Sequence, residues 1–202
     1  GSGNAFLRGI DITAARLELG AITLPAQRVS AVRAGAGWDV ALTGPARGVI
    51  HVPSLLEARA PWQVRLEQLH LPVPEAAPDA PARSAPDPRT LPTLDLDIRD
   101  LEVGSVELGH VRGVLQRTSI GYTAQNLVAE TDSYRLALDG RWELVDGQHY
   151  TSITAVLDSS DVGDTLAQLG YRGGLDADEG IVFTRVLRRR VFRVLRRWRR
   201  RS

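Results

Sequence analysis

The sequence contains no cysteine, no methionine and no lysine, and all 25 of its Lys/Arg positions are arginine. Without cysteine, disulfide bonds and thiolate metal sites are excluded. Aromatic residues form only 5% of the chain although 43% of it is hydrophobic, so the apolar side chains are mainly Leu, Val, Ala and Ile. This composition, with 19 Gly and 11 Pro as punctuation, is typical of many short strands joined by turns.

Long apolar runs are also missing. No stretch of about 18 apolar residues exists, so no membrane-spanning helix is expected, and no signal-peptide pattern stands at the start. Since the chain opens with Gly1-Ser2-Gly3 and has no Met, we expect a fragment of a larger protein.

Charge is distributed unevenly along the 202 residues. From Arg185 onward there are ten Arg and no acidic residue, whereas residues 1–184 hold 15 Arg and all 24 acidic residues, a formal net charge of −9. Such an asymmetry predicts a separate role for the C-terminal stretch.

Composition divides the chain into four parts. Residues 1–72 form a first β block, and residues 73–92 form a loop or linker, because six of the eleven prolines fall there. A second β block covers residues 93–171 and ends in a short helix. Residues 172–202 are an Arg-rich tail.

The second block has the clearest strand pattern. Leu94, Leu96 and Ile98 alternate with charged residues, as expected of a half-buried strand. Gly104-Ser105, Asp139-Gly140 and Asp146-Gly147 are predicted turns, and strands recur about every 8–12 residues, which favours an antiparallel meander.

Two helices are expected. Asp161 can cap a helix that runs to Leu169, where Gly170 supplies the stop. In the tail, apolar residues recur at helical spacing between Arg residues and predict a basic amphipathic helix. Its membrane-surface candidates are Phe183, Leu187, Val191, Leu195 and Trp198 on the apolar stripe, with Arg188, Arg189 and Arg196.

Three explanations of this tail are open. An amphipathic basic helix lies well on an anionic membrane surface. Clustered Arg also binds nucleic-acid phosphates, although this is not the first choice. Third, Arg-dense C-termini arise when GC-rich DNA is read out of frame, so residues 172–202 could be non-native sequence.

No motif supports catalysis or a cofactor. The four His residues have no helical metal-ligand spacing, and Asp95 and Asp97, two apart on a strand, are explained by a solvated face. Phosphate-binding loops and a nucleophilic-serine motif are absent. We therefore expect a non-enzymatic protein without metal or cofactor.

The order of several short patterns resembles the AsmA-like proteins of the YhdP type, relatives of TamB. The patterns are, in order, Gly37-Trp38, Gly48 to Pro53, Asp87-Pro88-Arg89, Leu108-Gly109, Gly140-Arg141-Trp142, Thr151 to Leu157, Asp161-Val162-Gly163 and Leu169-Gly170. Two short strands precede Gly37-Trp38 in this order, and the whole run covers about residues 8 to 171, about four fifths of the chain.

The resemblance implies an elongated, twisted, mainly antiparallel, taco-like β-groove in a large periplasmic protein, anchored in the inner membrane of a Gram-negative, GC-rich bacterium. Its groove would carry phospholipid acyl chains toward the outer membrane and maintain the envelope, with other segments of the same chain as partners. The lipid-facing candidates are Leu94, Leu96, Ile98, Ile120, Tyr122, Leu136, Leu138, Ile153 and Leu157. The alternative is a non-catalytic structural or interaction module whose apolar face is the core of a β-sandwich, since any packed sheet needs the same alternation.

Overall fold

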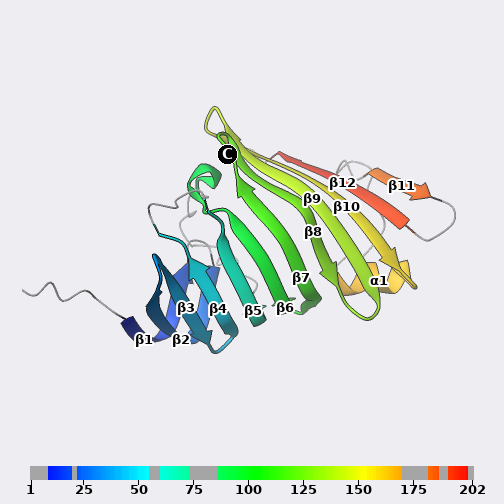
Figure 1. The fold of residues 1–202 in the computed structure, drawn as a ribbon. Helices are drawn as coiled ribbons and strands as arrows, with labels where there is room; N and C mark the ends of the chain where they lie inside the picture. Colours follow the sequence, from blue (N-terminus) through cyan, green and yellow to red (C-terminus); the bar gives the residue numbers. More distant parts are fainter. Residues whose placement is uncertain are drawn as a thin grey trace, which may run out of the picture.

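The protein is mainly β, and nearly all its strands join one open, mostly antiparallel sheet (Figure 1). The computed structural model describes residues 9–19, 22–54, 60–72, 86–169, 182–186 and 191–199. The strands are β1 (Gly9–Leu19), β2 (Ile22–Ala34), β3 (Gly37–Thr43), β4 (Ala46–Val52), β5 (Trp62–Leu71), β6 (Leu94–Val103), β7 (Val106–Arg117), β8 (Gly121–Glu130), β9 (Tyr134–Val145), β10 (Gln148–Ser159), β11 (Val182–Val186) and β12 (Val191–Arg199).

The strand order follows the sequence from β1 to β10, and β12 and β11 then add to the β10 edge. All neighbours are antiparallel except β5 and β6, which run parallel with Val64 opposite Leu96 and Leu66 opposite Ile98. This ladder joins the two predicted β blocks into one sheet. Because β6 begins beside the start of β5, the end of β5 at Leu71 and the start of β6 at Leu94 lie at opposite ends of these strands.

Two of the three predicted turns of the second block are confirmed. Gly104 joins β6 to β7 with a φ of 63°, and Asp146-Gly147 joins β9 to β10 with both residues at positive φ. The third prediction is wrong, because Asp139-Gly140 lies inside β9, with Gly140 opposite Ile153. Its Asp139 carboxylate instead accepts the backbone N–H of Asn126, at a bulge of β8 where Asn126 has a φ of 51°.

The short helix near 161–169 is confirmed as α1 (Val162–Gln168), and the Asp161 carboxylate caps it by accepting the backbone N–H of Asp164. A single 3-10 turn, η2 (Pro88–Thr90), forms in the described part of the predicted linker. Residues 73–85 lie outside the described part. In that part of the chain, no helix is long and apolar enough to cross a membrane.

The predicted basic C-terminal helix is wrong, because Val182–Val186 and Val191–Arg199 are strands. Nine consecutive residues of β12 pair with β10, Val191 opposite Asp158 and Arg199 opposite Tyr150. A sheet edge offers a row of unpaired backbone N–H and C=O groups, and pairing with it outweighs a local helical spacing of apolar residues.

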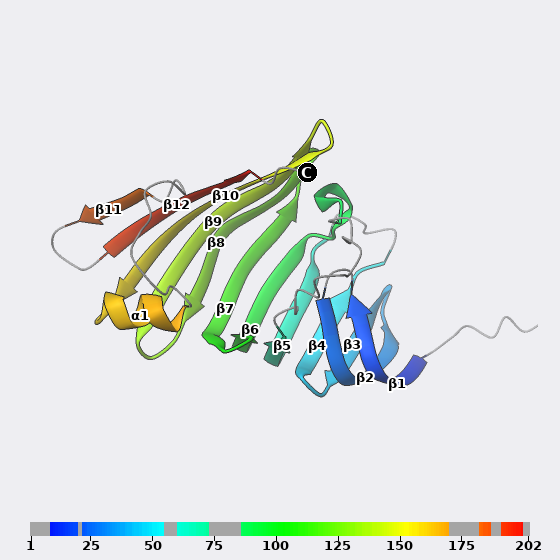
Figure 2. The same ribbon diagram turned by 180° about the vertical axis from the view of Figure 1, so that it is seen from behind.

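The sheet is curved rather than flat. In Figure 1 strands β1 and β2 and helix α1 lie behind the main sheet, and in Figure 2 they lie in front of it, so the sheet curls toward the face that α1 covers. At the end of β3, the Gln27 side chain reaches from β2 to the first residue of β4. Its amide nitrogen donates to the Ala46 carbonyl at 2.9 Å, and its amide oxygen accepts the Ala46 N–H at 3.2 Å.

Gln27 therefore replaces a main-chain ladder where β3 has already ended. Both partners are almost inaccessible, with Gln27 1% and Ala46 0% exposed. We expect Gln27→Ala to lower the free energy of unfolding by about 2–3 kcal/mol in urea denaturation, because two buried backbone groups lose their partners. Gln116→Ala, at an exposed position of β7, is the matched control and should stay within about 0.5 kcal/mol. Equal effects of the two substitutions would contradict this role for Gln27.

Candidate functional site

One face of the sheet is apolar across ten strands, and it is the candidate site. The strand registers place its residues in continuous rows. One row runs through Ile12, Val29, Leu42, Gly48, Leu66, Ile98 and Val111. On the C-terminal strands the same face carries Ala129, Leu136 and Leu157 in one row, and Leu127, Leu138 and Ala155 in the next. We call this surface the apolar face.

The apolar face is closed over β2–β6. Leu42, Val64, Leu66 and Ile98 are buried and pack together, and half-buried residues of β2 to β6 surround them. Each such side chain that leaves water contributes about 1.5–3 kcal/mol, so this cluster is a major source of stability.

Helix α1 covers one end of the face. Its Leu166, with Leu169 just after it, packs on Tyr134 and Leu157, and the Tyr134 hydroxyl donates to the Glu107 carbonyl at 2.7 Å. Burial raises the pKa of Tyr134, so the phenol stays neutral and donates.

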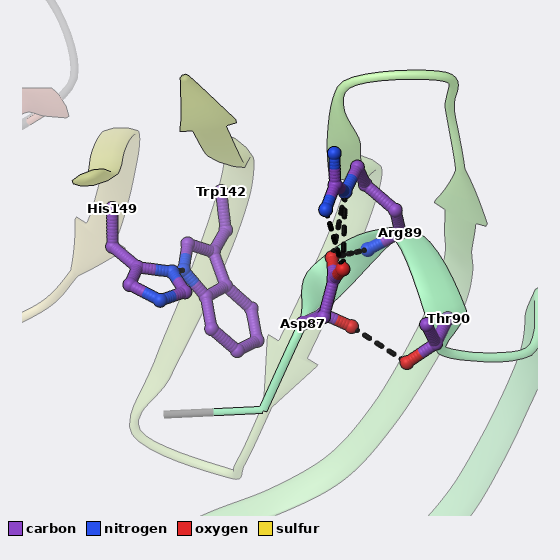
Figure 3. Close-up of polar contacts among 5 residues, drawn as sticks. All are labelled: Asp87, Arg89, Thr90, Trp142 and His149. Carbon is purple, nitrogen blue, oxygen red and sulfur yellow. Dashed lines mark hydrogen bonds and ion pairs between the residues drawn. The ribbon is translucent and has the colours of Figure 1, made fainter. Parts of the chain in front are cut away.

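The end of the predicted linker covers the opposite end of the face. Pro88 of η2 is fully buried, and the turn packs against β7, β8 and β9. The Tyr122 hydroxyl donates to the Pro92 carbonyl at 2.6 Å, and burial raises the pKa of Tyr122 to about 12. Beside η2, the Trp142 indole N–H donates to His149 Nδ1 at 3.0 Å, and Figure 3 shows Trp142 between His149 and Asp87.

Between these two covers the face is more open. Ile153 is 39% exposed, and Leu127, Leu136 and Leu138 are half-buried. In the residues that the structure describes, the helices α1 and η2 lie only at the strand ends, and no second sheet lies on this middle zone.

Most of the predicted lipid-facing residues share the apolar face, but Ile120 does not. Those placed on it are Leu94, Leu96, Ile98, Tyr122, Leu136, Leu138, Ile153 and Leu157. Ile120 precedes β8 and lines a hollow of about 520 Å³ with the polar residues Thr123, Arg141 and Ser152. Alternation fails there because a turn before Gly121, held by Thr118, interrupts the strand.

The predicted membrane-surface residues are not brought together on one stripe. Leu187, Arg188 and Arg189 lie outside the described residues. Along β12 the backbone register puts Leu195 opposite Thr154 and Trp198 opposite Thr151, which are on different faces of β10. Arg196 is opposite Ile153, Val191 is opposite Asp158, and Phe183 of β11 is opposite Val194.

The other face of the sheet is polar and laced by ion pairs between neighbouring strands. The ion pairs are Arg28–Asp11 at 2.7 Å, Arg65–Asp95 at 2.7 Å and Arg112–Glu130 at 3.2 Å. His51 forms a hydrogen bond with Asp39 at 2.7 Å, and His110 forms one with Asp97 at 2.8 Å. The hydrogen bond from His110 lowers the pKa of Asp97. Asp95 and Asp97 thus have separate basic partners, and no group of three His or carboxylate side chains in the described ranges could hold a metal.

The sequence patterns missed the first block's share of the site. Val64 and Leu66 alternate with polar residues in Trp62–Leu71, as Leu94, Leu96 and Ile98 do in β6. That signal was sufficient to nominate them as part of the same face. The alternation did not reveal that β5 and β6 pair in parallel, which places these residues on one face.

Comparison with known proteins identifies one relationship. Residues 2–184 match the family model described as "YhdP protein". The match starts before the patterns described above and continues beyond residue 171, where those patterns end. No curated protein and no solved structure matched the chain.

At η2, Asp87 and Arg89 form an exposed ion pair at 2.7 Å. Arg89 donates from its guanidinium to both Asp87 carboxylate oxygens and from its backbone N–H to one of them (Figure 3), which lowers the pKa of Asp87 from 3.8 to about 2. A lowered carboxyl pKa means that the stabilisation is complete above about pH 4 and is lost as the pH falls through about 2.

We expect NMR titration of the Asp87 carboxyl carbon to show this low pKa, and Arg89→Gln to move it upward toward 3.8. Arg112→Gln, on the polar face, should leave it unchanged. A pKa that stays near 2 in Arg89→Gln would show that Arg89 does not hold the carboxylate.

Proposed function

The chain belongs to the YhdP family, an AsmA-like family of cell-envelope proteins, and we propose that it is a segment of a periplasmic groove that conducts phospholipids between the inner and outer membranes. The observation that carries the proposal is the apolar face, which continues through ten strands of one sheet without a second sheet over its middle zone in the described residues. In this proposal the parent protein is anchored in the inner membrane and maintains the envelope.

The dimensions of the face suit acyl chains. Ten strands spaced about 4.8 Å apart extend about 43 Å along the sheet, and a ten-residue strand is about 33 Å long. The hydrocarbon core of a bilayer is about 30 Å thick, so the acyl chains of one leaflet are about 15 Å long. A chain of that length fits between the cover at η2 and the cover at α1.

The proposal requires no catalytic step and no cofactor. The acidic and His side chains of the polar face are engaged in ion pairs and hydrogen bonds across strands, and exposed pairs of this kind contribute only about 0–1 kcal/mol each. Their arrangement supports a solvated outer surface. The alternative, a β-sandwich interaction module, would need a second sheet on the apolar face, and the described strands all belong to one sheet.

Photo-crosslinking tests the lipid contact directly. With a benzophenone amino acid at Leu138 or Ile153 in living cells, we expect phospholipid adducts identifiable by mass spectrometry, because both positions lie on the more open middle zone of the apolar face. The same group at Gln116, on the exposed opposite side of β7, is the control and should give none. If Leu138 and Ile153 yield protein adducts alone, the face is a protein interface.

The Arg-rich end is proposed to bind anionic membrane surfaces by charge alone, since the amphipathic helix is not formed. Ten Arg without an acidic residue after position 184 support this. We expect flotation with phosphatidylglycerol liposomes at low salt and not with phosphatidylcholine liposomes, and loss of flotation when residues 185–202 are removed. Equal flotation of the full and shortened chains would overturn it.

A further inference from the structure

Three of the four tryptophans lie at one end of the apolar face. Trp38, Trp62 and Trp142 stand at the same end of β3, β5 and β9, on positions that alternate with Val40, Val64 and Gly140 of this face. The ladders connect them. Trp38 is opposite Val52, Trp62 is opposite Leu94 and Leu94 is opposite Leu115, while Trp142 is opposite Tyr122.

These aromatic residues are spread along the edge and do not form one cluster. With strands about 4.8 Å apart, Trp38 and Trp62 are about 10 Å apart and Trp62 and Trp142 about 19 Å. Trp142 and Tyr122 lie beside η2, where they bond to His149 and Pro92. Trp62 is 36% exposed, so the aromatic edge is most accessible on β5.

Two arginines occupy the same edge of the same face. Arg33 is opposite Trp38 in the β2–β3 ladder, and Arg117 is opposite Tyr122 in the β7–β8 ladder. Both are exposed, and both alternate with apolar residues of the face, Ala31 and Leu115. We call the set Arg33, Trp38, Trp62, Arg117, Tyr122 and Trp142 the aromatic rim.

The opposite edge has a different chemistry. Its described positions on this face include the aliphatic residues Leu69, Leu101 and Leu157. Beside α1, a hollow lined by Tyr134 and Gln168 also carries four acidic residues, Asp100, Glu107, Glu130 and Asp132, against Arg99 and His110. The two edges thus differ, because the α1 edge is aliphatic with an excess of acidic groups and the rim is aromatic and cationic.

Resting on the proposed function, we propose that the aromatic rim is a row of headgroup subsites along the face, and that each binds the phosphate end of one glycerophospholipid whose acyl chains point toward α1. Trp and Tyr prefer the boundary between apolar and polar surroundings, because their rings are apolar and one end forms hydrogen bonds. Arg binds phosphate through a planar fork of donors. The positive charge at the rim is complementary to that phosphate, whereas the acidic groups beside α1 would repel it and the aliphatic residues between the two edges suit the chains.

Fluorescence quenching tests this orientation. The first variant of the full chain has Trp38→Phe, Trp142→Phe and Trp198→Phe, so Trp62 is its one tryptophan. The second variant has all four tryptophans replaced by Phe and carries Leu138→Trp, so its one tryptophan lies in the middle zone. Each is loaded from phosphatidylglycerol vesicles doped with phosphatidylcholine that carries a nitroxide either on the headgroup or near the end of an acyl chain. Gel filtration then removes the vesicles, and circular dichroism confirms the fold of each variant.

We expect the headgroup nitroxide to quench Trp62 at least twice as strongly as the chain nitroxide, and the reverse order for Leu138→Trp. Equal or inverted quenching at the two positions would overturn the headgroup subsites while leaving lipid binding intact. Absence of quenching by either lipid at both positions would overturn the proposed function and the subsites with it.

The charges are tested separately. Arg33 on β2 and Arg117 on β7 are five strands or about 24 Å apart, so each would meet a different phosphate. Arg33→Gln and Arg117→Gln together should therefore weaken retention of phosphatidylglycerol about fivefold, since each basic group at an anionic lipid surface accounts for about fivefold in affinity. Arg112→Gln with Arg141→Gln removes the same charge from the polar face and should change retention less than twofold. Equal losses in the two double variants would contradict a specific phosphate contact at the rim.

Discussion

The parallel ladder between β5 and β6 is the constraint on which the rest of the structure depends. It matches Val64 with Leu96 and Leu66 with Ile98, so that the apolar rows of the two β blocks become one surface. A slip of this register by one residue would place every apolar side chain of β6 on the polar face. The ladder also places the end of β5 and the start of β6 at opposite ends of these strands, and η2, the described end of the Pro-rich connection, lies on the apolar face beside Trp142.

The polar face of the sheet keeps the protein solvated, and the apolar face stabilises the fold. Polar pairs such as Arg65–Asp95 and His110–Asp97 are exposed and contribute little energy, so they mainly keep the outer surface solvated and in register. Stability comes from the apolar face, which is buried over β2–β6 and half-open over β8–β10. Apolar side chains of this face therefore hold the N-terminal half together, and those of the C-terminal half would offer an apolar surface to a ligand.

The two covered edges of the apolar face differ in chemistry. The α1 edge is aliphatic with an excess of acidic groups, while the η2 edge carries tryptophans, Tyr122 and two arginines from strands far apart in sequence. An amphipathic molecule distinguishes such edges, because its charged end loses hydration free energy at the first and gains hydrogen bonds at the second. In the proposed function, the polarity across the face, more than its apolarity alone, would select lipids with a charged end.

The sequence by itself determined the local features. Alternation of apolar and polar residues predicted the strands, Gly104 and Asp146-Gly147 predicted two turns, and Asp161 predicted α1, because each depends only on neighbouring residues. Tertiary structure decided the parallel register of β5 and β6, the inclusion of Asp139-Gly140 in β9, the exclusion of Ile120 from the apolar face and the conversion of the predicted tail helix into β11 and β12. These features depend on which strand edge is free to pair and on residues distant in the chain, and local spacing carries no information about either.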